Sequence, residues 1–158
     1  AWCISSGTKR IENREWEPPP HVVGRWIALH SGLTYDKEGA AKLAENLAEL
    51  QIAVPPDAET CPKGVIVAVM HVAGAVEVAW DGDSPLAMKT VVGPLKSDQV
   101  DLVLRSPWAT GPWCWFVDDV VTIDPVPCRG MRKIWRVPDD LADQVRERYR
   151  AARSVNPQ

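Results

Sequence analysis

The sequence predicts an α+β domain in which short strands close into a small mixed β-barrel with flanking helices. Several short runs rich in β-branched and aromatic residues lie between loops that contain proline or glycine, a pattern typical of strands. Two longer segments instead carry apolar residues at helical spacing. Strands combined with two long helices favour the α+β class, and 158 residues suit a single domain covering 1–158.

The first half of the chain predicts a short helix, two strands and one long helix. The opening AWCISSG is a helical turn that Gly7 ends, because glycine is favoured just after a helix. Alternation in RIENREW predicts a strand with four side chains on one face: Arg10, Glu12, Arg14 and Trp16. After the proline-rich loop EPPPHVVG, a strand is predicted at RWIALHS, and DKEGAAKLAENLAEL is a helix with Asp36 as its cap.

The second half predicts more strands and a C-terminal helix. VIVAVMHVAGAVEVAW is one long or two short strands with a bend at Gly74, and DGDSPLAMKTVVGPLKSDQ is an irregular insertion that begins with a turn. Further strands are expected around WCWFV, DVVTI and KIWRVP. DDLADQVRERYRAARS is a helix capped by Asp139 or Asp140, and residues 154–158 form a flexible tail.

Charge is distributed unevenly along the chain. The formal net charge of −3 argues against a strongly electropositive nucleic-acid binder. Residues 1–35 nevertheless sum to +1 and residues 129–158 to +4, whereas residues 36–128 sum to −8. If the two ends meet in the fold, they form a local basic patch that the net charge conceals.

The cysteines and the hydropathy exclude several classes of protein. Cys3, Cys61, Cys114 and Cys128 form no Cys-x-x-Cys pair and have no histidine at ligand spacing, so we expect buried thiols and neither a metal nor a cofactor. No apolar run is long enough for a membrane span, and the start of the chain lacks a signal-peptide pattern. We therefore expect a cytoplasmic protein, without disulfides, that acts as a monomer.

One motif carries a resemblance to a known family. GTKRIENR fits the pattern Gly-x-Lys-x-x-Glu-x-Arg through Gly7, Lys9, Glu12 and Arg14. It resembles the signature of the ASCH domain family (activating signal cointegrator homology). The segments RWIALHS, GVIVAVMHVAGAV, SPWATGPWCWFVDDVVTI and PVPCRGMRKIWRVP resemble later strands of that family in the same order, so the similarity runs over nearly the whole chain. Family members usually begin with one more strand, which predicts a trimmed or disordered first strand here.

The resemblance implies a fold and a function. ASCH domains resemble PUA domains, which are small mixed barrels with a cleft and are related to RNA-binding modules and to the YTH and EVE readers of modified bases. The signature residues line that cleft in the family. Most members are inferred to bind RNA or nucleotides, a few small bacterial members are amidohydrolases acting on acetylated cytidine, and nuclease activity has been proposed for others.

The chemistry of the charged and aromatic residues fits a nucleotide site. Lys9, Arg10 and Arg14 supply positive charge and donors for a phosphate or a base edge. Glu12 could accept from the amino group of a base, and tryptophan rings could stack on one. The candidate binding set is Lys9, Arg10, Glu12, Arg14, Trp16, Trp108, Trp113, Trp115 and Arg129.

Three other interpretations stay open. Without the resemblance, Lys9, Glu12 and Arg14 are simply a structural set of ion pairs. An enzyme that hydrolyses RNA or a modified nucleoside would use Lys9 and Glu12, but the family's hydrolases carry Thr at the position of Glu12, and a carboxylate surrounded by cations is a poor base. A ribonuclease would need an acid–base pair, but His30 and His71 lie in apolar strands and are more typical of core or rim residues.

The third alternative is a protein-interaction module with a vestigial cleft. We therefore expect a binder of RNA, a nucleotide or a modified nucleoside, with no assigned catalytic residue.

Overall fold

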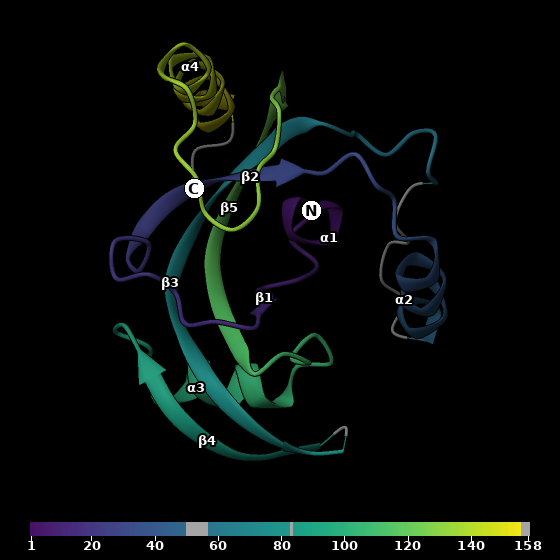
Figure 1. Cartoon of the computed structure of the whole chain (residues 1–158), viewed down its shortest axis with the longest axis vertical. Helices are drawn as coiled ribbons and strands as arrows, with labels where there is room; N and C mark the ends of the chain where they lie inside the picture. The colour runs from purple at the N-terminus through teal and green to yellow at the C-terminus, as the bar shows by residue number, and fades with distance from the viewer. Residues whose placement is uncertain (50–56, 83, 156–158) are drawn as a thin grey trace. The chain divides into compact units, whose positions relative to one another are not determined.

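The computed structural model describes residues 1–49, 57–82 and 84–155 and confirms the α+β class (Figure 1). Its elements are α1 (Trp2–Ser5), β1 (Ile11–Arg14), β2 (Arg25–Ser31), α2 (Lys37–Glu49), β3 (Val65–Asp81), β4 (Ser84–Val92), α3 (Ser97–Arg105), β5 (Trp113–Pro127) and α4 (Asp139–Val155). The strands form one sheet in the order β1-β5-β3-β2, with β4 also paired to β3. Over the described residues this sheet is not closed, so the barrel stays a prediction.

The chain divides into two compact units, and β3 and β5 contribute residues to both. The first unit comprises Ala1–Thr8, Ala28–Val69 and Val121–Gln158, and the second comprises Lys9–Ile27 and Met70–Val120. Among the described residues, no helix combines the length and the apolar content that a bilayer crossing requires.

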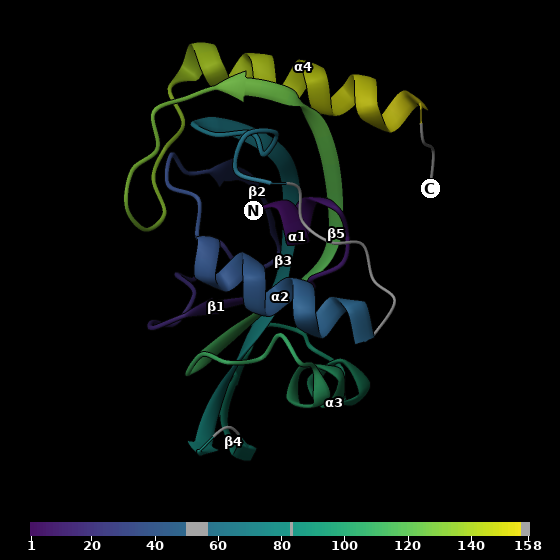
Figure 2. The same ribbon diagram turned by 90° about the vertical axis from the view of Figure 1, so that its right-hand side faces the viewer.

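The core of the first unit forms where α4 packs on the last part of β5 (Figure 2). Val145 of α4 is buried against β3 and β5, with Leu141 and Tyr149 of the same helix packed around it. These three positions follow the helical spacing that the sequence predicts. Asp139 and Asp140 lie in the first turn and Arg153 in the last, as the helix dipole favours. Ser154 and Val155, the start of the predicted tail, are the last residues of α4, and 156–158 lie outside the described residues.

The core of the second unit joins β1, β3, β5 and α3. Ile11, Val76, Val103, Cys114 and Phe116 are all buried in it. Strand β1 pairs antiparallel with β5, so that Ile11 lies opposite Phe116 on the core face. The predicted alternation of RIENREW is therefore confirmed for Ile11–Arg14, and Trp16 lies beyond the end of the strand.

The predicted irregular insertion is wrong, because it folds as β4 and the start of α3. Pro85, a residue type depleted in strands, lies opposite Trp80 where β4 pairs with β3. Two register shifts in this pairing accommodate the irregularity, as β-bulges do. In α3, the Gln99 side chain accepts from the Lys96 N–H, and Val100 enters the core.

Several other boundaries also differ from the prediction. KIWRVP is not a strand, because residues 132–134 form a bend and Lys133 has φ of 63°, which an extended strand does not allow. WCWFV and DVVTI belong to one continuous strand, β5. Of the two alternatives for VIVAVMHVAGAVEVAW, one long strand is confirmed, because β3 runs unbroken through Gly74. Gly74 marks a close approach: a Cβ there would lie 2.4 Å from the Val92 carbonyl oxygen. The predicted cap of α2 is confirmed, since the Gly39 N–H donates to the Asp36 carboxylate at 2.8 Å.

Candidate functional site

The pairing of β1 with β5 positions the charged residues of the signature segment, and Gly7 precedes them in the chain at the end of α1. Gly7 has φ of 78°, a left-handed conformation that ends the helical turn without the strain a side chain would add. Lys9 lies just before β1, and Glu12 lies opposite Trp115 of β5. Because neighbouring residues of a strand point to opposite faces, Glu12 and Asn13 have different surroundings.

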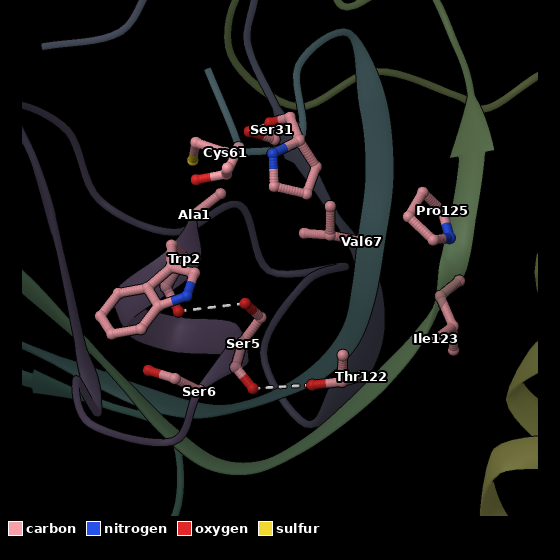
Figure 3. Close-up of a pocket in the computed structure, with 12 residues that line it drawn as sticks. Ala1, Trp2, Ser5, Ser6, Ser31, Cys61, Val67, Thr122, Ile123 and Pro125 are labelled. Atoms are coloured by element: carbon pink, nitrogen blue, oxygen red, sulfur yellow. Dashed lines mark hydrogen bonds between the residues drawn. The ribbon is translucent and has the colours of Figure 1, made fainter. Parts of the chain in front are cut away.

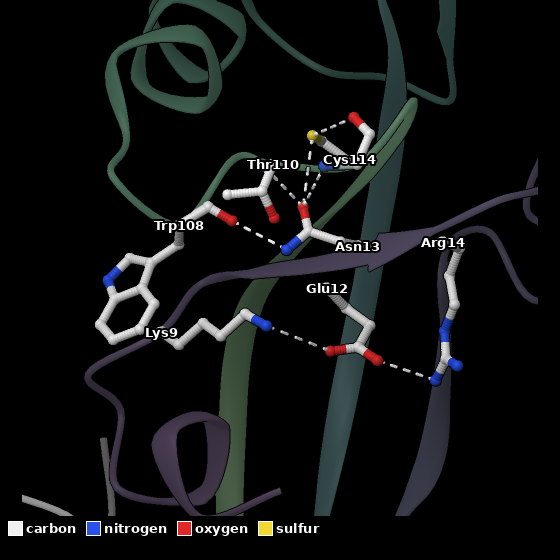
Figure 4. A network of polar contacts seen from close by, with 8 residues as sticks. Lys9, Glu12, Asn13, Arg14, Trp108, Thr110 and Cys114 are labelled. Atoms are coloured by element: carbon white, nitrogen blue, oxygen red, sulfur yellow. Dashed lines mark hydrogen bonds and ion pairs between the residues drawn. The ribbon is translucent and has the colours of Figure 1, made fainter. Parts of the chain in front are cut away.

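Glu12 is shared between two cations, and we call Lys9, Glu12 and Arg14 the Glu12 cluster (Figure 4). Arg14 Nη2 lies 2.8 Å from Glu12 Oε1, and Lys9 Nζ lies 3.6 Å from Glu12 Oε2. The side chains of Lys9, Glu12 and Arg14 are 20%, 19% and 37% exposed, so the cluster is partly buried but within reach of solvent. The structure thus brings together the three charged residues at the fixed positions of the motif.

Arg14 also contacts the aromatic residues behind the cluster. Its guanidinium carbon lies 6.0 Å from the ring centroid of Trp115, at the limit of a cation–π contact. Trp16 meets Trp115 edge-on, with ring centroids 4.9 Å apart, and the Trp115 indole N–H donates to the Trp16 carbonyl at 3.3 Å. Trp115 is 1% exposed, so it supports Arg14 and Trp16 and offers no open face for a base.

Asn13, which the sequence analysis did not select, organises the opposite face of β1 (Figure 4). Its amide donates to the Trp108 carbonyl at 2.9 Å, and its Oδ1 accepts the N–H groups of Thr110 and Gly111, both at 3.1 Å. Gly111 packs so closely that a Cβ there would lie 2.8 Å from the Asn13 Cβ. Asn13 therefore holds the 108–111 loop against β1. The sequence contained one indication of this role: Asn13 lies inside a predicted strand, where asparagine is depleted.

Cys114 completes the Asn13 network. Its thiol lies 3.6 Å from both Asn13 Oδ1 and the Gly111 carbonyl oxygen. Burial raises the pKa of the Cys114 thiol, which keeps it neutral at physiological pH. Cys128 is buried as well, whereas Cys3 and Cys61 are only half-buried, and the four cysteines form no disulfide.

The remaining candidate residues do not all converge on the Glu12 cluster. Arg10 donates to the Asp118 backbone carbonyl at 3.4 Å. Trp108 packs half-buried against the core of the second unit, and Trp113 is half-buried opposite Arg14 at the start of β5. Arg129 is exposed and belongs to the first unit, where it lines a separate pocket.

Two pockets in the first unit are lined by other residues. One, of about 440 Å³, is formed around α1 and the ends of β2 and β5, with Trp2, Ser5, Ser31, Cys61 and Thr122 in its wall (Figure 3). The hydroxyls of Ser5, Ser31 and Thr122 all donate to backbone carbonyls. The second pocket has a volume of about 880 Å³, and its lining includes His30, Leu33, Arg129, Met131 and Arg132. Neither pocket is lined by a residue of the Glu12 cluster.

Comparison of the chain with models of known protein families and with curated proteins finds no match. The ASCH resemblance therefore rests on the motif and on the order of the later segments. Among the described residues, no group of three or more His, Cys, Asp or Glu side chains is arranged to hold a metal ion.

Proposed function

We propose that the chain is an RNA- or nucleotide-binding module whose ligand contacts the Glu12 cluster. The observation that carries the proposal is that Lys9 and Arg14 share one carboxylate. Two cations against one anion leave a positive charge, and the ammonium and guanidinium groups have three and five donors, respectively, of which the described ion pairs use few. The remaining donors suit a phosphate group or the acceptors of a base edge.

Partial burial strengthens the case for a ligand at this cluster. Charges at partly buried positions interact more strongly than charges in bulk water, because the effective dielectric constant is lower. The Nε of Arg14 is buried and has no hydrogen-bond partner among the described residues. An unsatisfied buried donor costs about 1–3 kcal/mol, so a side-chain shift that lets an incoming acceptor reach this group would be favoured.

Base recognition would rest on Glu12 and Trp16. A carboxylate oxygen that accepts an exocyclic amino group would favour an amino-bearing base over one with only carbonyl groups. Trp16 is half-buried, with its edge against Trp115, and keeps part of its ring surface exposed for stacking. The ligand class is therefore a nucleotide, or a single-stranded RNA segment, in which a phosphate and a base are bound together.

The ASCH resemblance supports the same proposal. Gly7, Lys9, Glu12 and Arg14 occupy the fixed positions of the motif, and each has a physical role: the glycine ends α1, and the other three form the cluster. On this basis we propose that the open sheet of the described residues corresponds to the PUA-like barrel of that family.

The hydrolase alternative has less support. Both carboxylate oxygens of Glu12 are engaged by cations, which disfavours their use as a base for water. The nearby hydroxyl of Thr8 lies 2.9 Å from that of Ser6 and precedes Lys9 in the chain. No proton-transfer path from a nucleophile to Glu12 follows from these contacts.

A protein-interaction module is the second candidate, and one observation favours it. Leu33 and Met131 are 78% and 58% exposed and line the 880 Å³ pocket together with Arg129 and Arg132. Exposed apolar side chains with arginine at their rim are common at protein interfaces. This surface shares no residue with the Glu12 cluster, so the two candidate functions can be tested with separate variants.

The test is equilibrium binding of nucleoside monophosphates and of a six-nucleotide single-stranded RNA to matched variants. Lys9→Ala and Arg14→Ala should each weaken binding about five- to tenfold, because each removes a phosphate or base donor. Lys89→Ala is the control for Lys9, since Lys89 is 58% exposed and lies 3.9 Å from Glu77. Arg146→Ala is the control for Arg14, since Arg146 pairs with Asp143 on α4. Equal binding by all four variants would overturn the proposal.

A further inference from the structure

A row of contacts crosses four neighbouring strands of the second unit. Its members are Arg10 just before β1, Asp118 on β5, His71 on β3 and Trp26 on β2, and the strands follow one another in that order in the sheet. Arg10 donates to the Asp118 carbonyl at 3.4 Å, His71 Nδ1 lies 2.7 Å from Asp118 Oδ1, and the Trp26 and His71 rings lie 5.4 Å apart. We call these four residues the cross-strand row.

His71 is a rim residue, one of the two positions that its apolar strand suggested. Its side chain is 25% exposed, and that of Asp118 is 38% exposed. With Nδ1 directed at the carboxylate, the orientation of the imidazole ring is fixed, and Nε2 points away from Asp118. Asp118 is thus a positioning residue for the His71 ring.

Trp26 supplies the second ring of the row. It is 41% exposed and lies tilted at 50° to His71. A single exposed hydrophobic side chain is ordinary on a protein surface. An exposed indole beside an imidazole of fixed orientation is less ordinary, because the two rings together form an aromatic surface at the end of the strand order β1-β5-β3-β2.

The charge of the row indicates what kind of contact it can make. Arg10 donates to the backbone carbonyl of Asp118, and the Asp118 carboxylate lies against His71. The opposite formal charges of Arg10 and Asp118 sum to zero, so the row as a whole adds little attraction for a phosphate. Phosphate attraction in this unit comes instead from Lys9 and Arg14. What the row offers is ring surface, and nucleobases stack on such surfaces with little dependence on sequence.

We propose that Trp26 and His71 form a stacking surface for a second base of a single-stranded RNA whose phosphate is held at the Glu12 cluster. This inference rests on the proposed function and adds a second contact to it. Three strand spacings of about 4.8 Å separate β1 from β2, about 14 Å in total. A stacked strand advances about 3.4 Å per nucleotide, so the two contacts should lie at least about four nucleotides apart. The path is longer than the strand spacings alone, because Asp118 follows the alternation of Phe116, on the face of the sheet opposite Glu12 and Trp115.

The experiment compares Trp26→Ala with wild type for RNA oligonucleotides of one to eight nucleotides. Binding of one or two nucleotides should be unchanged, and binding of six or eight should weaken roughly five- to 100-fold. The salt dependence should stay unchanged in Trp26→Ala, because no phosphate contact is removed, and should fall in Lys9→Ala. Leu102→Ala is the matched control, since Leu102 is 55% exposed on α3 of the same unit and lies outside the row.

A second variant gives a direct readout of contact. Trp26→Phe keeps a ring for stacking, so it should bind the eight-nucleotide RNA within about threefold of wild type. The quenching of tryptophan fluorescence by bound RNA should nevertheless decrease in this variant, because an exposed indole has been removed. His71→Phe should likewise retain binding, whereas His71→Ala should weaken binding of the longer RNAs only.

The outcomes separate this inference from the proposed function. If wild type binds no RNA or nucleotide, both fail. If wild type binds and Lys9→Ala weakens binding, but Trp26→Ala binds eight nucleotides as wild type does, the stacking surface alone is overturned. An equal loss for one nucleotide and for eight in Trp26→Ala would also overturn it, because the row would then belong to the first nucleotide's site.

Discussion

Glu12 and Asn13 are neighbours on β1, yet their side chains do opposite things (Figure 4). Asn13 donates to Trp108 and accepts from Thr110 and Gly111, so its bonds hold one part of the chain to another. Glu12 forms one ion pair with Lys9 and one with Arg14, and each of these cations has further N–H donors that do not contact Glu12. The difference separates a residue that stabilises the fold from a residue that organises a charged surface, although both lie within a single motif.

The largest expected effect is the loss of stability on removal of the Asn13 amide. Asn13→Ala leaves the Gly111 N–H buried without its acceptor and the Trp108 carbonyl without its donor. We expect a loss of about 2–3 kcal/mol in the free energy of unfolding and a Tm lower by roughly 5–10 °C. Denaturant and thermal unfolding measure this.

Asn13→Asp is the matched control for that change. It keeps an oxygen acceptor for Thr110 and Gly111 but turns a carboxylate oxygen toward the Trp108 carbonyl, so it should also lose stability. Part of that loss should be recovered at acidic pH, where the protonated carboxyl can donate to Trp108. If Asn13→Ala unfolds at the wild-type denaturant concentration, Asn13 does not hold the 108–111 loop.

Changes in the Glu12 cluster should have a small effect on stability and a larger effect on RNA binding. Lys9→Ala or Arg14→Ala removes one partly exposed ion pair, which is worth about 1 kcal/mol or less in stability. The same variants should lose about five- to tenfold in affinity for single-stranded RNA. Unfolding and binding measured on the same preparations compare the two quantities, and a loss of stability larger than that of Asn13→Ala would reverse the assignment of roles.

A smaller effect in the opposite direction is expected for Glu12→Gln. The amide keeps the shape of the side chain and removes the negative charge, so the attraction of Lys9 and Arg14 for a phosphate rises. Phosphate-only ligands should bind about two- to threefold more tightly. Ligands with an exocyclic amino group should gain less, because the variant has one carbonyl oxygen where Glu12 has two. Titration with inorganic phosphate and with cytidine and uridine monophosphates tests both statements, and weaker phosphate binding would count against them.

The smallest effect concerns Cys114 at alkaline pH. The folded-state pKa of this thiol is raised by burial, so the folded state favours the protonated form more than the unfolded state does. The contribution of this neutral thiol to the stability of the folded state is fully present below the unfolded-state pKa, which is near 9.0. It decreases as the pH rises from that value through the folded-state pKa. Unfolding measured from pH 7 to 10 should show this decrease in wild type and a weaker one in Cys114→Ala, and identical pH profiles would contradict it.

The strand Arg25–Ser31 was predictable because a proline-rich loop precedes it, and the C-terminal helix because its apolar residues have a clear helical period. The α+β class follows from the presence of both kinds of segment. It missed β4 because Pro85 and the flanking glycines resemble a loop, whereas pairing with β3 and its bulges stabilises a strand there. The Glu12 cluster followed from motif spacing on one strand. The Asn13 network and the cross-strand row depend on residues far apart in sequence, such as Asn13 with Gly111 and His71 with Asp118, which no local period reveals.

The most direct test of the central claim is the salt dependence of RNA binding by wild type and by Lys9→Ala. If Lys9 contacts a phosphate, the slope of log K against log salt should decrease in magnitude by about 0.7 in the variant, the value for one contact to a single strand. Lys89→Ala, which removes a positive charge outside the cluster, should keep the wild-type slope. A slope unchanged by Lys9→Ala would contradict the claim that the cations of the Glu12 cluster bind the ligand.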